Sequence, residues 1–268
     1  MKIPCFQIDA FASKVFRGNP AAVCPLDAWL PDSTLQNIAA ENNLSETAFV
    51  VPRGDEFDLR WFTPTMEVDL CGHATLAAAF VLFTEQKFSG DTIRFHSRSG
   101  ILVVSRAGEI LTLDFPARPP QPCAMPEALA RGLGSQPAQV FKSRDYLAVF
   151  DSAEAVRALR PDFAALKTLN SLGVIATAPG DGCDFVSRFF APAAGIDEDP
   201  VTGSAHCTLI PYWAQRLGKT KMFARQISQR GGELFCELAG DRVRIGGKAV
   251  LYLRGEIVLD DAATVHKK

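Results

Sequence analysis

The chain has 268 residues, and its 28 Lys and Arg against 30 Asp and Glu leave a formal net charge of -2 at pH 7. No segment gathers about five or more like charges, so neither nucleic acid nor an anionic membrane is an expected partner. The longest apolar run, residues 76–83, is far shorter than the roughly 20 residues of a membrane-spanning helix, and the first residues do not resemble a signal peptide, so we expect a cytoplasmic protein.

Seven segments before residue 116 alternate apolar with polar residues or are rich in β-branched residues, and we predict that they are strands. They are residues 3–11, 21–24, 47–51, 57–62, 92–95, 101–106 and 110–115. Residues 27–42 have the amphipathic pattern of a surface helix. Residues 74–83 are instead apolar around most of a helical cylinder, which is typical of a helix enclosed by other structure.

A proline-rich stretch, Phe115-Pro-Ala-Arg-Pro-Pro-Gln-Pro122, follows and cannot lie inside a helix or a central strand. We place a domain boundary there. The N-terminal half comprises residues 1–117 and the C-terminal half residues 118–268, and the sequence leaves open whether the C-terminal tail returns to the first half.

Beyond this boundary the same kinds of element recur. The predicted strands are residues 140–150, 173–178, 184–190, 226–229, 234–238, 243–245 and 249–253, and the predicted surface helices are residues 126–132 and 153–159. Residues 205–217 predict a second enclosed helix. Pro211 lies inside it and should kink the helix or leave a backbone carbonyl without its usual partner.

An internal repeat connects the two halves. Arg60-Trp-Phe-Thr-Pro64 reappears 128 residues later as Arg188-Phe-Phe-Ala-Pro192, and Gly72-His-Ala74 is matched 131 residues later by Gly203-Ser-Ala205. Many strands around one buried helix, twice over, indicate an α+β fold. We predict two pseudo-symmetric domains, each a curled mixed β-sheet wrapped around a central apolar helix.

Each enclosed helix begins at a motif with a glycine, Asp69-Leu-Cys-Gly-His73 in the first half and Asp199-Pro-Val-Thr-Gly-Ser204 in the second. The first turn of a helix has unpaired N–H groups and a positive dipole end, so Gly72 and Gly203 would let a ligand carboxylate approach the backbone. If the halves face each other about a pseudo-two-fold axis, both starts meet in one cleft between domains, where small-molecule sites tend to lie.

The same motifs have a purely structural alternative. Asp69 and Asp199 could cap their helices, while His73 and Ser204 simply fill positions in the first turn. The internal repeat favours the functional interpretation, because it would bring two such helix starts to one place.

Glu46 is the candidate general base. It begins the apolar strand of residues 47–51, whereas the repeat places Val174 at the corresponding point of the second half. A partly desolvated carboxylate is suited to take a proton and return it. The alternative is a solvated residue at the edge of a strand.

Neither a cofactor nor a metal is expected. The chain has no glycine-rich dinucleotide motif and no phosphate loop, and its four histidines show no metal-ligand spacing with one another or with its seven cysteines. The cysteines form no Cys-x-x-Cys pair, and their odd number fits a reduced compartment.

Five motifs together resemble the PhzF-like phenazine-biosynthesis family. They are Phe16-Arg-Gly-Asn-Pro-Ala-Ala-Val23, Leu44-Ser-Glu-Thr-Ala-Phe49, Arg60-Trp-Phe-Thr-Pro64, Leu70-Cys-Gly-His-Ala-Thr75 and Asp197-Glu-Asp-Pro-Val-Thr-Gly-Ser-Ala-His206. The resemblance is essentially full length. It implies the fold of diaminopimelate epimerase, with two pseudo-symmetric domains and no cofactor, and so agrees with the fold that the repeat predicts.

The resemblance also implies an isomerase in which a glutamate shuttles a proton between carbons of the substrate. That role falls to Glu46. By the same similarity His73 and Asp199 assist as catalytic residues, and Gly203 and Ser204 bind the substrate.

Two further residues are predicted to bind the substrate. The amides of Gly72 and of its neighbour in the helix start can hold an oxyanion. Asn19 follows a glycine in a loop and can reach the ligand, although a turn-forming role is an equal alternative. We therefore expect a small carboxylate- or amino-acid-like metabolite as the partner, and a homodimer is compatible with the sequence.

Two other functions remain open at this stage. One is a non-catalytic protein that keeps the pocket only to bind a metabolite. The other is a hydrolase or racemase that depends on Cys71. A racemase with two cysteines is disfavoured, because the position equivalent to Cys71 in the second half is Thr202.

Overall fold

The computed structural model describes residues 1–260 and divides the chain into two compact units. The first consists of Met1–Asp114 together with the chain from Gly247 onward, and the second consists of Phe115–Gly246. The second unit is therefore inserted between two segments of the first.

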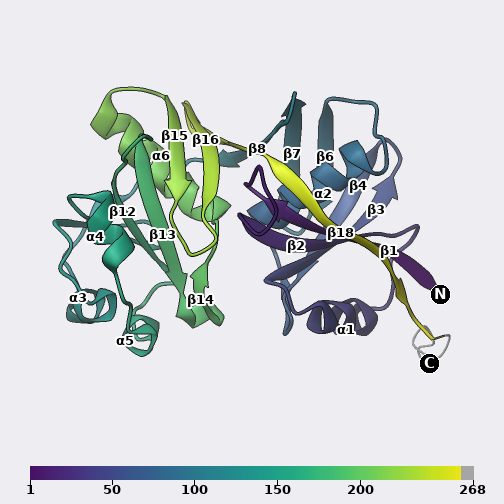
Figure 1. Ribbon diagram of the computed structural model, residues 1–268, viewed down its shortest axis with the longest axis horizontal. Helices are drawn as coiled ribbons and strands as arrows, with labels where there is room; N and C mark the ends of the chain where they lie inside the picture. The colour runs from purple at the N-terminus through teal and green to yellow at the C-terminus, as the bar shows by residue number, and fades with distance from the viewer. Residues whose placement is uncertain (261–268) are drawn as a thin grey trace. The chain divides into compact units, whose positions relative to one another are not determined.

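The first unit is a curled mixed sheet with one helix inside it (Figure 1). Its strands are β1 (Lys2–Ala10), β2 (Asn19–Pro25), β3 (Glu46–Arg53), β4 (Glu56–Phe62), β5 (Glu67–Val68), β6 (Thr92–Ser97), β7 (Gly100–Ala107), β8 (Ile110–Pro116) and β18 (Ala249–Val258). Hydrogen bonding gives the order β18-β1-β2-β3-β4-β6-β7-β8, with β5 on β4.

The enclosed helix of this unit is α2 (Gly72–Thr84), which packs against β1, β2 and β3. All its residues except Gly72, Phe80 and Thr84 are buried. The prediction of an enclosed helix here is confirmed, with the start two residues earlier than expected. The amphipathic helix α1 (Asp32–Asn42) covers the sheet through Leu35 and Ile38.

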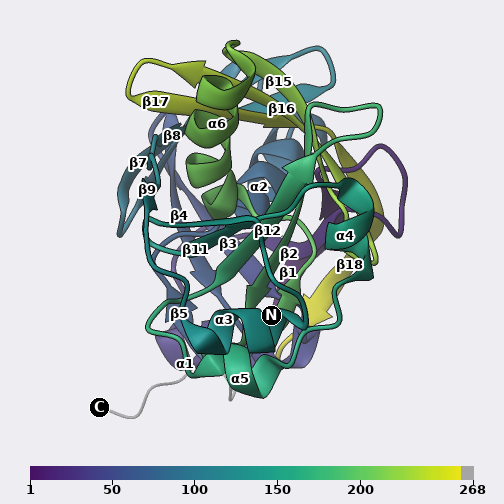
Figure 2. The same ribbon diagram turned by 90° about the vertical axis from the view of Figure 1, so that its left-hand side faces the viewer.

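The second unit repeats this arrangement (Figure 2). Its strands are β9 (Gln121–Pro122), β10 (Gln139–Lys142), β11 (Tyr146–Val149), β12 (Val174–Pro179), β13 (Phe185–Ala191), β14 (Ile196–Asp199), β15 (Lys221–Gln226), β16 (Gly232–Ala239) and β17 (Arg242–Gly247). They are ordered β9-β10-β11-β12-β13-β15-β16-β17, with β14 on β13.

The directions of the strands match as well as their order. In the first unit β2 runs parallel to β3, β3 antiparallel to β4, and β4 parallel to β6. In the second unit β11, β12, β13 and β15 repeat these relations. The predicted α+β fold of two pseudo-symmetric domains around central apolar helices is confirmed.

The central helix of the second unit, α6 (Gly203–Leu217), shows how the chain accommodates Pro211. A proline has no N–H to donate to the carbonyl four residues earlier, which here belongs to Cys207. The backbone N–H of Arg118 donates to that carbonyl instead, over 2.9 Å. The expectation of a freed carbonyl is confirmed, and the proline-rich segment after residue 115 supplies its partner.

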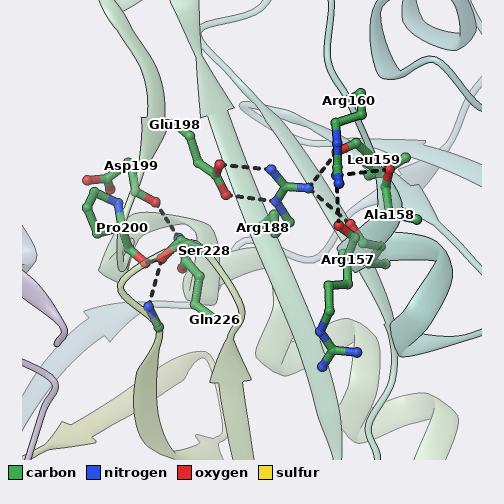
Figure 3. A network of polar contacts seen from close by, with 12 residues as sticks. Arg157, Ala158, Leu159, Arg160, Arg188, Glu198, Asp199, Pro200, Gln226 and Ser228 are labelled. Carbon is green, nitrogen blue, oxygen red and sulfur yellow. Dashed lines mark hydrogen bonds and ion pairs between the residues drawn. The ribbon is translucent and has the colours of Figure 1, made fainter.

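An arginine–glutamate ion pair occurs at the same place in both units. Arg60 Nε and Nη2 donate to the two carboxylate oxygens of Glu67 over 2.7 and 2.8 Å. Arg188 does the same to Glu198 over 2.8 Å for each bond (Figure 3). These are the arginines of the internal repeat, and each pair joins two strands just before the central helix begins.

The third arm of each guanidinium holds a surface helix. Arg60 Nη1 donates to Asp32 at the start of α1 over 2.9 Å. Arg188 Nη1 donates to the carbonyls of Val156 and Leu159, where α4 (Ala153–Ala158) ends. One side chain therefore fixes three elements in each unit.

Several predicted elements differ from the structure. The prediction of a strand at residues 226–229 is wrong, because β15 ends at Gln226 and buries its alternate residues Met222, Ala224 and Gln226. The strand expected at residues 140–150 is divided by a turn at residues 143–145. The helix expected at residues 27–42 begins only at Asp32, because a residue that precedes a proline, here Leu30, is disfavoured in a helix.

Some short elements were not expected from the sequence. They are β5, β9, β14, α5 (Phe163–Lys167) and the 3-10 turn η1 (Pro192–Ala194). The predicted surface helix 126–132 corresponds to α3 (Glu127–Leu133). Within residues 1–260, no helix combines the length and the apolar character needed to cross a bilayer.

The Arg188–Glu198 ion pair gives a test of this framework. Both side chains are mostly buried, at 11% and 21% exposure. Arg188→Met leaves Glu198 and two carbonyls without their donor, so we expect the free energy of unfolding to fall by about 2–4 kcal/mol. Denaturant unfolding combined with hydrogen exchange of the β13 amides would measure this loss.

Arg157→Met is the matched control. Arg157 lies in the same unit, and its guanidinium makes none of the contacts drawn in Figure 3. We expect this variant to stay within about 0.5 kcal/mol of the unaltered protein. Equal stabilities of the two variants would contradict the role given to Arg188.

Candidate active site

Glu46 is the first residue of β3, and its carboxylate is buried. The chain leaves α1 through Asn43 in the left-handed conformation and enters β3, which pairs Glu46 with Ala21 of the parallel strand β2. Glu46 is only 8% exposed, and its Oε2 lies 3.1 Å from Nε2 of His73. These two atoms are not aligned for a hydrogen bond, and neither has another hydrogen-bond partner among residues 1–260.

His73 is the second residue of α2 and contacts Asn19 through its other ring nitrogen. Asn19 begins β2 and is fully buried, and its Nδ2 lies 3.1 Å from Nδ1 of His73. When the Asn19 amide donates to Nδ1, the proton of a neutral imidazole must be on Nε2. That proton then faces the carboxylate of Glu46.

Cys71 completes this group, with its Sγ 3.5 Å from Nδ1 of His73. Burial and, to a smaller extent, the Glu46 carboxylate raise the pKa of the Cys71 thiol to about 11, although His73 acts in the opposite direction. Burial lowers the pKa of His73, but the Cys71 sulfur and the Glu46 carboxylate raise it by more, so that its pKa lies above the ordinary value.

The start of α2 is not capped by a carboxylate. Its N-cap residue is Cys71, and Asp69 is exposed, with 74% of its side chain accessible. Its carboxylate lies 4.0 Å from the Arg98 guanidinium, and its backbone carbonyl accepts from the Ser99 hydroxyl over 2.8 Å. The alternative in which Asp69 caps this helix is wrong, and the turn that begins at Gly72 keeps its N–H groups.

In the second unit, Asp199 ends β14 and is 8% exposed. Its Oδ2 accepts a short hydrogen bond of 2.5 Å from the hydroxyl of Thr202. Thr202 is the N-cap residue of α6, and its side chain makes no capping hydrogen bond to this helix. Asp199 therefore holds the N-cap residue in place.

Gln226 and Ser228 fix the segment around Asp199 (Figure 3). Gln226 is 1% exposed; its Nε2 donates to the Asp199 carbonyl over 2.7 Å, and its Oε1 accepts from the Thr202 N–H over 2.9 Å. The Ser228 hydroxyl donates to the Pro200 carbonyl over 2.8 Å. The backbone that leads into Gly203 is thus held on both sides.

Ser204, the second residue of α6, contacts a residue that the sequence did not single out. Its Oγ accepts from Nη2 of Arg144 over 3.0 Å. Arg144 was not predicted because it lies in the turn that divides a predicted continuous strand. The contacts of Gln226 were not predicted because a strand was expected to begin at this residue, where β15 ends.

His206 has a structural role. Its Nδ1 is 2.8 Å from the Thr202 carbonyl, just as the Thr75 hydroxyl in the first unit donates to the Cys71 carbonyl. Burial lowers the pKa of His206 to about 4, although the contact with Thr202 acts in the opposite direction. A neutral, fully buried imidazole is unsuited to proton transfer at pH 7.

Glu46, Cys71 and His73 could also be considered as metal ligands, since their donor atoms lie within 4.8 Å of one another. However, the thiol faces Nδ1 of His73 and the carboxylate faces Nε2. One ion can bind only one of these nitrogens, so at least one side chain would have to move. The expectation that no metal is bound stays a prediction.

The structure thus brings Asn19, Glu46 and His73 together beside Gly72, and separately places Asp199 at the helix start of Gly203-Ser204. That both groups face one substrate stays a prediction.

The strand register moves the counterpart of Glu46 in the second unit by one residue. Thr47 pairs with Phe62 and Val174 pairs with Phe190, so the residue that corresponds to Glu46 is Gly173 instead of Val174. The second unit still has no carboxylate there.

Comparison with known proteins defines first the class and then the family. A predicted epimerase from Pseudomonas aeruginosa shares the fold, with a TM-score of 0.74 over 96% of this chain and all of that chain at 24% identity. A PhzF-family crystal structure from Enterococcus faecalis has a TM-score of 0.95 and 50% identity, covering 97% of this chain and 100% of that chain. The fold is therefore that of the PhzF proteins, and the predicted epimerase shares it.

The sequence comparisons identify the family. The sequence profile of phenazine biosynthesis-like proteins (PhzC-PhzF) matches residues 8–255. A protein of P. aeruginosa named as an uncharacterized isomerase is 58% identical over 260 residues, which cover 97% of this chain and 100% of that protein. The chain belongs to the PhzC-PhzF family and is an enzyme of the isomerase class.

The contact between Glu46 and His73 predicts an unusual histidine titration. A histidine whose pKa is raised on folding adds stability that is fully present below its unfolded pKa of about 6.5 and is lost as pH rises through the folded pKa. In NMR titrations we expect His73 to stay protonated above pH 6.5. Glu46→Gln should lower its pKa, because burial remains when the carboxylate is gone.

His206 serves as the control within the same protein, since it should stay neutral down to about pH 4 in both forms. An unchanged His73 titration in Glu46→Gln would show that the carboxylate does not set the protonation of this imidazole.

Proposed function

We propose that this protein is a cofactor-independent isomerase of a small carboxylate-bearing or amino-acid-like metabolite, in which Glu46 takes a proton from one carbon and returns it to another. The observation that carries the proposal is the buried carboxylate of Glu46, 3.1 Å from an imidazole at the start of an enclosed helix. Clusters of desolvated ionisable groups of this kind are typical of sites of proton transfer.

The proposed reaction needs no oxidant or reductant. The Glu46 carboxylate removes a proton from a carbon of the substrate, and the electrons of the broken C–H bond enter an adjacent unsaturated system. The protonated carboxyl then delivers the proton to a different carbon of that system. The product is an isomer of the substrate, and Glu46 returns to its ionised form.

In this proposal His73 stabilises the charge that moves through the site. Its Nε2 lies beside Glu46 and can donate to a substrate oxygen, while Asn19 holds the ring through Nδ1. The N–H groups of the turn beginning at Gly72 offer further donors to a developing oxyanion.

The family resemblance extends the proposal to the second unit. Asp199 is assigned to orient polar groups of the substrate and to assist proton transfer, and Gly203 and Ser204 are assigned to bind it. The restraints on Asp199 by Thr202 and the adjoining backbone support this assignment, because a fixed carboxylate loses little entropy when a substrate binds.

Incubation of the protein in deuterium oxide with a library of small carboxylic and amino acids tests the proposal. We expect one substrate to gain deuterium at carbon and to change into an isomer, as followed by mass spectrometry and NMR. Glu46→Gln should lower the rate of both events by at least about 10²-fold, which is the usual contribution of a general base.

Glu41→Gln is the matched control, because Glu41 is an exposed glutamate on α1, five residues away in sequence. It should act like the unaltered protein. Normal exchange by a folded Glu46→Gln variant would remove Glu46 from the role of base. Binding of a metabolite without exchange or chemical change would favour the non-catalytic alternative.

Cys71→Ala tests the cysteine-dependent alternative. The thiol is buried, its pKa is about 11, and the counterpart Thr202 donates its hydroxyl to Asp199. We therefore expect the variant to keep its deuterium exchange within about tenfold of the original rate. A loss as large as that of Glu46→Gln would instead make the thiol a reacting group.

A further inference from the structure

Arg144 occupies an unusual position for a cation, beside the first turn of α6. The amino end of a helix carries a partial positive charge and favours anions, so a guanidinium there needs anions nearby, which here are Asp145 and Asp199. Its Nη2 nevertheless donates to Ser204 Oγ over 3.0 Å. The first turn of α6 contains no acidic residue.

Asp145 fixes this guanidinium in place. Asp145 is 1% exposed, and its Oδ2 accepts from Nε and Nη2 of Arg144 over 3.0 and 2.7 Å. The turn itself is held by hydrogen bonds from the Ser143 N–H to the Asp145 carbonyl and from the Ser171 hydroxyl to the Arg144 carbonyl. A long, flexible side chain is thus oriented in advance of any ligand.

The guanidinium still has binding capacity. With Nε and Nη2 engaged, Nη1 has no hydrogen-bond partner within the described part of the chain, and about a third of the Arg144 side chain, 34%, is exposed. Asp145 Oδ1 is also buried without a partner among residues 1–260. Arg144 Nη1 therefore lacks an acceptor, which a ligand would supply. Asp145 Oδ1 lacks a donor, which a water molecule bound with the ligand would supply.

A second cation acts on the same end of α6. Cys207 lies one helical turn after Gly203, and burial raises the pKa of its thiol to about 11, while Arg118 and Arg144 act in the opposite direction. The backbone N–H of Arg118 donates to the Cys207 carbonyl over 2.9 Å, so this second arginine also lies beside α6.

The residue that corresponds to Arg144 in the first unit also contacts the start of the central helix. In the first unit Asn19, at the amino end of β2, contacts His73, the second residue of α2. In the second unit Arg144, just before the equivalent strand β11, contacts Ser204, the second residue of α6. The same place in the repeated fold carries an amide in one unit and a guanidinium in the other.

We propose that Arg144 is a substrate-binding residue whose guanidinium, with the Ser204 hydroxyl and the uncapped N–H groups of the first turn of α6, holds a carboxylate of the substrate. The inference rests on the proposed isomerase function and deepens it, because it makes an anionic group a requirement for binding. Arginine suits this role, since its planar fork can bond Asp145 and a second carboxylate at once.

Propionate and propionamide are suitable probes, because they have nearly the same shape and differ in charge. Each is titrated into ¹⁵N-labelled full-length protein at constant ionic strength, and the shifts of the amides of residues 203–205 are followed by NMR. We expect saturable shifts with propionate and at least about tenfold weaker binding of propionamide.

Arg144→Met should weaken propionate binding at least about tenfold and leave propionamide unchanged. Arg144→Met also leaves the buried Asp145 without its partner, so Arg144→Lys is made as a second variant. The lysine keeps the positive charge but lacks the planar fork of the guanidinium, and we expect it to bind propionate with intermediate affinity. Arg157→Met, an exposed arginine of the same unit, should bind propionate like the unaltered protein.

Unchanged propionate binding by a folded Arg144→Met variant, equal binding of the two probes, or no saturable shift at residues 203–205 would overturn the inference. These results are independent of turnover. If propionate binding depends on Arg144 but no substrate exchanges deuterium, the proposed function fails; if Glu46 is required for exchange but Arg144 is not required for anion binding, only this inference fails.

Discussion

The contact between the buried carboxylate of Glu46 and the imidazole of His73 is the constraint on which the rest of the account depends. A carboxylate that is removed from water raises the free energy of the folded state unless polar groups surround it. Here His73 is the compensating group, and Asn19 fixes its ring from the other side. The first strand residue of β3 and the first turn of α2 must therefore meet at one point, and the curled sheet around α2 brings them there.

The repeated arginine–glutamate ion pair explains how the fold keeps such points in place. Arg60–Glu67 joins β4 to β5, and Arg188–Glu198 joins the equivalent strands β13 and β14. Each pair holds the chain just before the central helix of its unit begins. On this common framework the two units carry different side chains. The first has an acid and a histidine, whereas the second has Asp199 and, near Ser204, the guanidinium of Arg144. Duplication of the framework therefore did not duplicate the chemistry.

The sequence predicted the parts of this structure that follow from local pattern. Both enclosed helices are visible as runs apolar on all sides, and the repeated Arg-x-Phe-x-Pro motif revealed the duplication, although nothing local showed that Arg60 and Arg188 pair with Glu67 and Glu198. The position of Arg144 could not be predicted, because the turn that contains it lies within residues 140–150, whose pattern predicts one continuous strand. The contact of Glu46 with His73 joins residues 27 positions apart, and only the sheet topology brings them together.

A crystal structure of the Glu46→Gln variant with the substrate identified by deuterium exchange would test the central claim most directly. The account predicts that the exchanging carbon lies about 3–3.5 Å from the side chain of residue 46, which is the range of a near-attack geometry. A substrate whose exchanging carbon lies against Cys71 or Asp199, out of reach of residue 46, would contradict it.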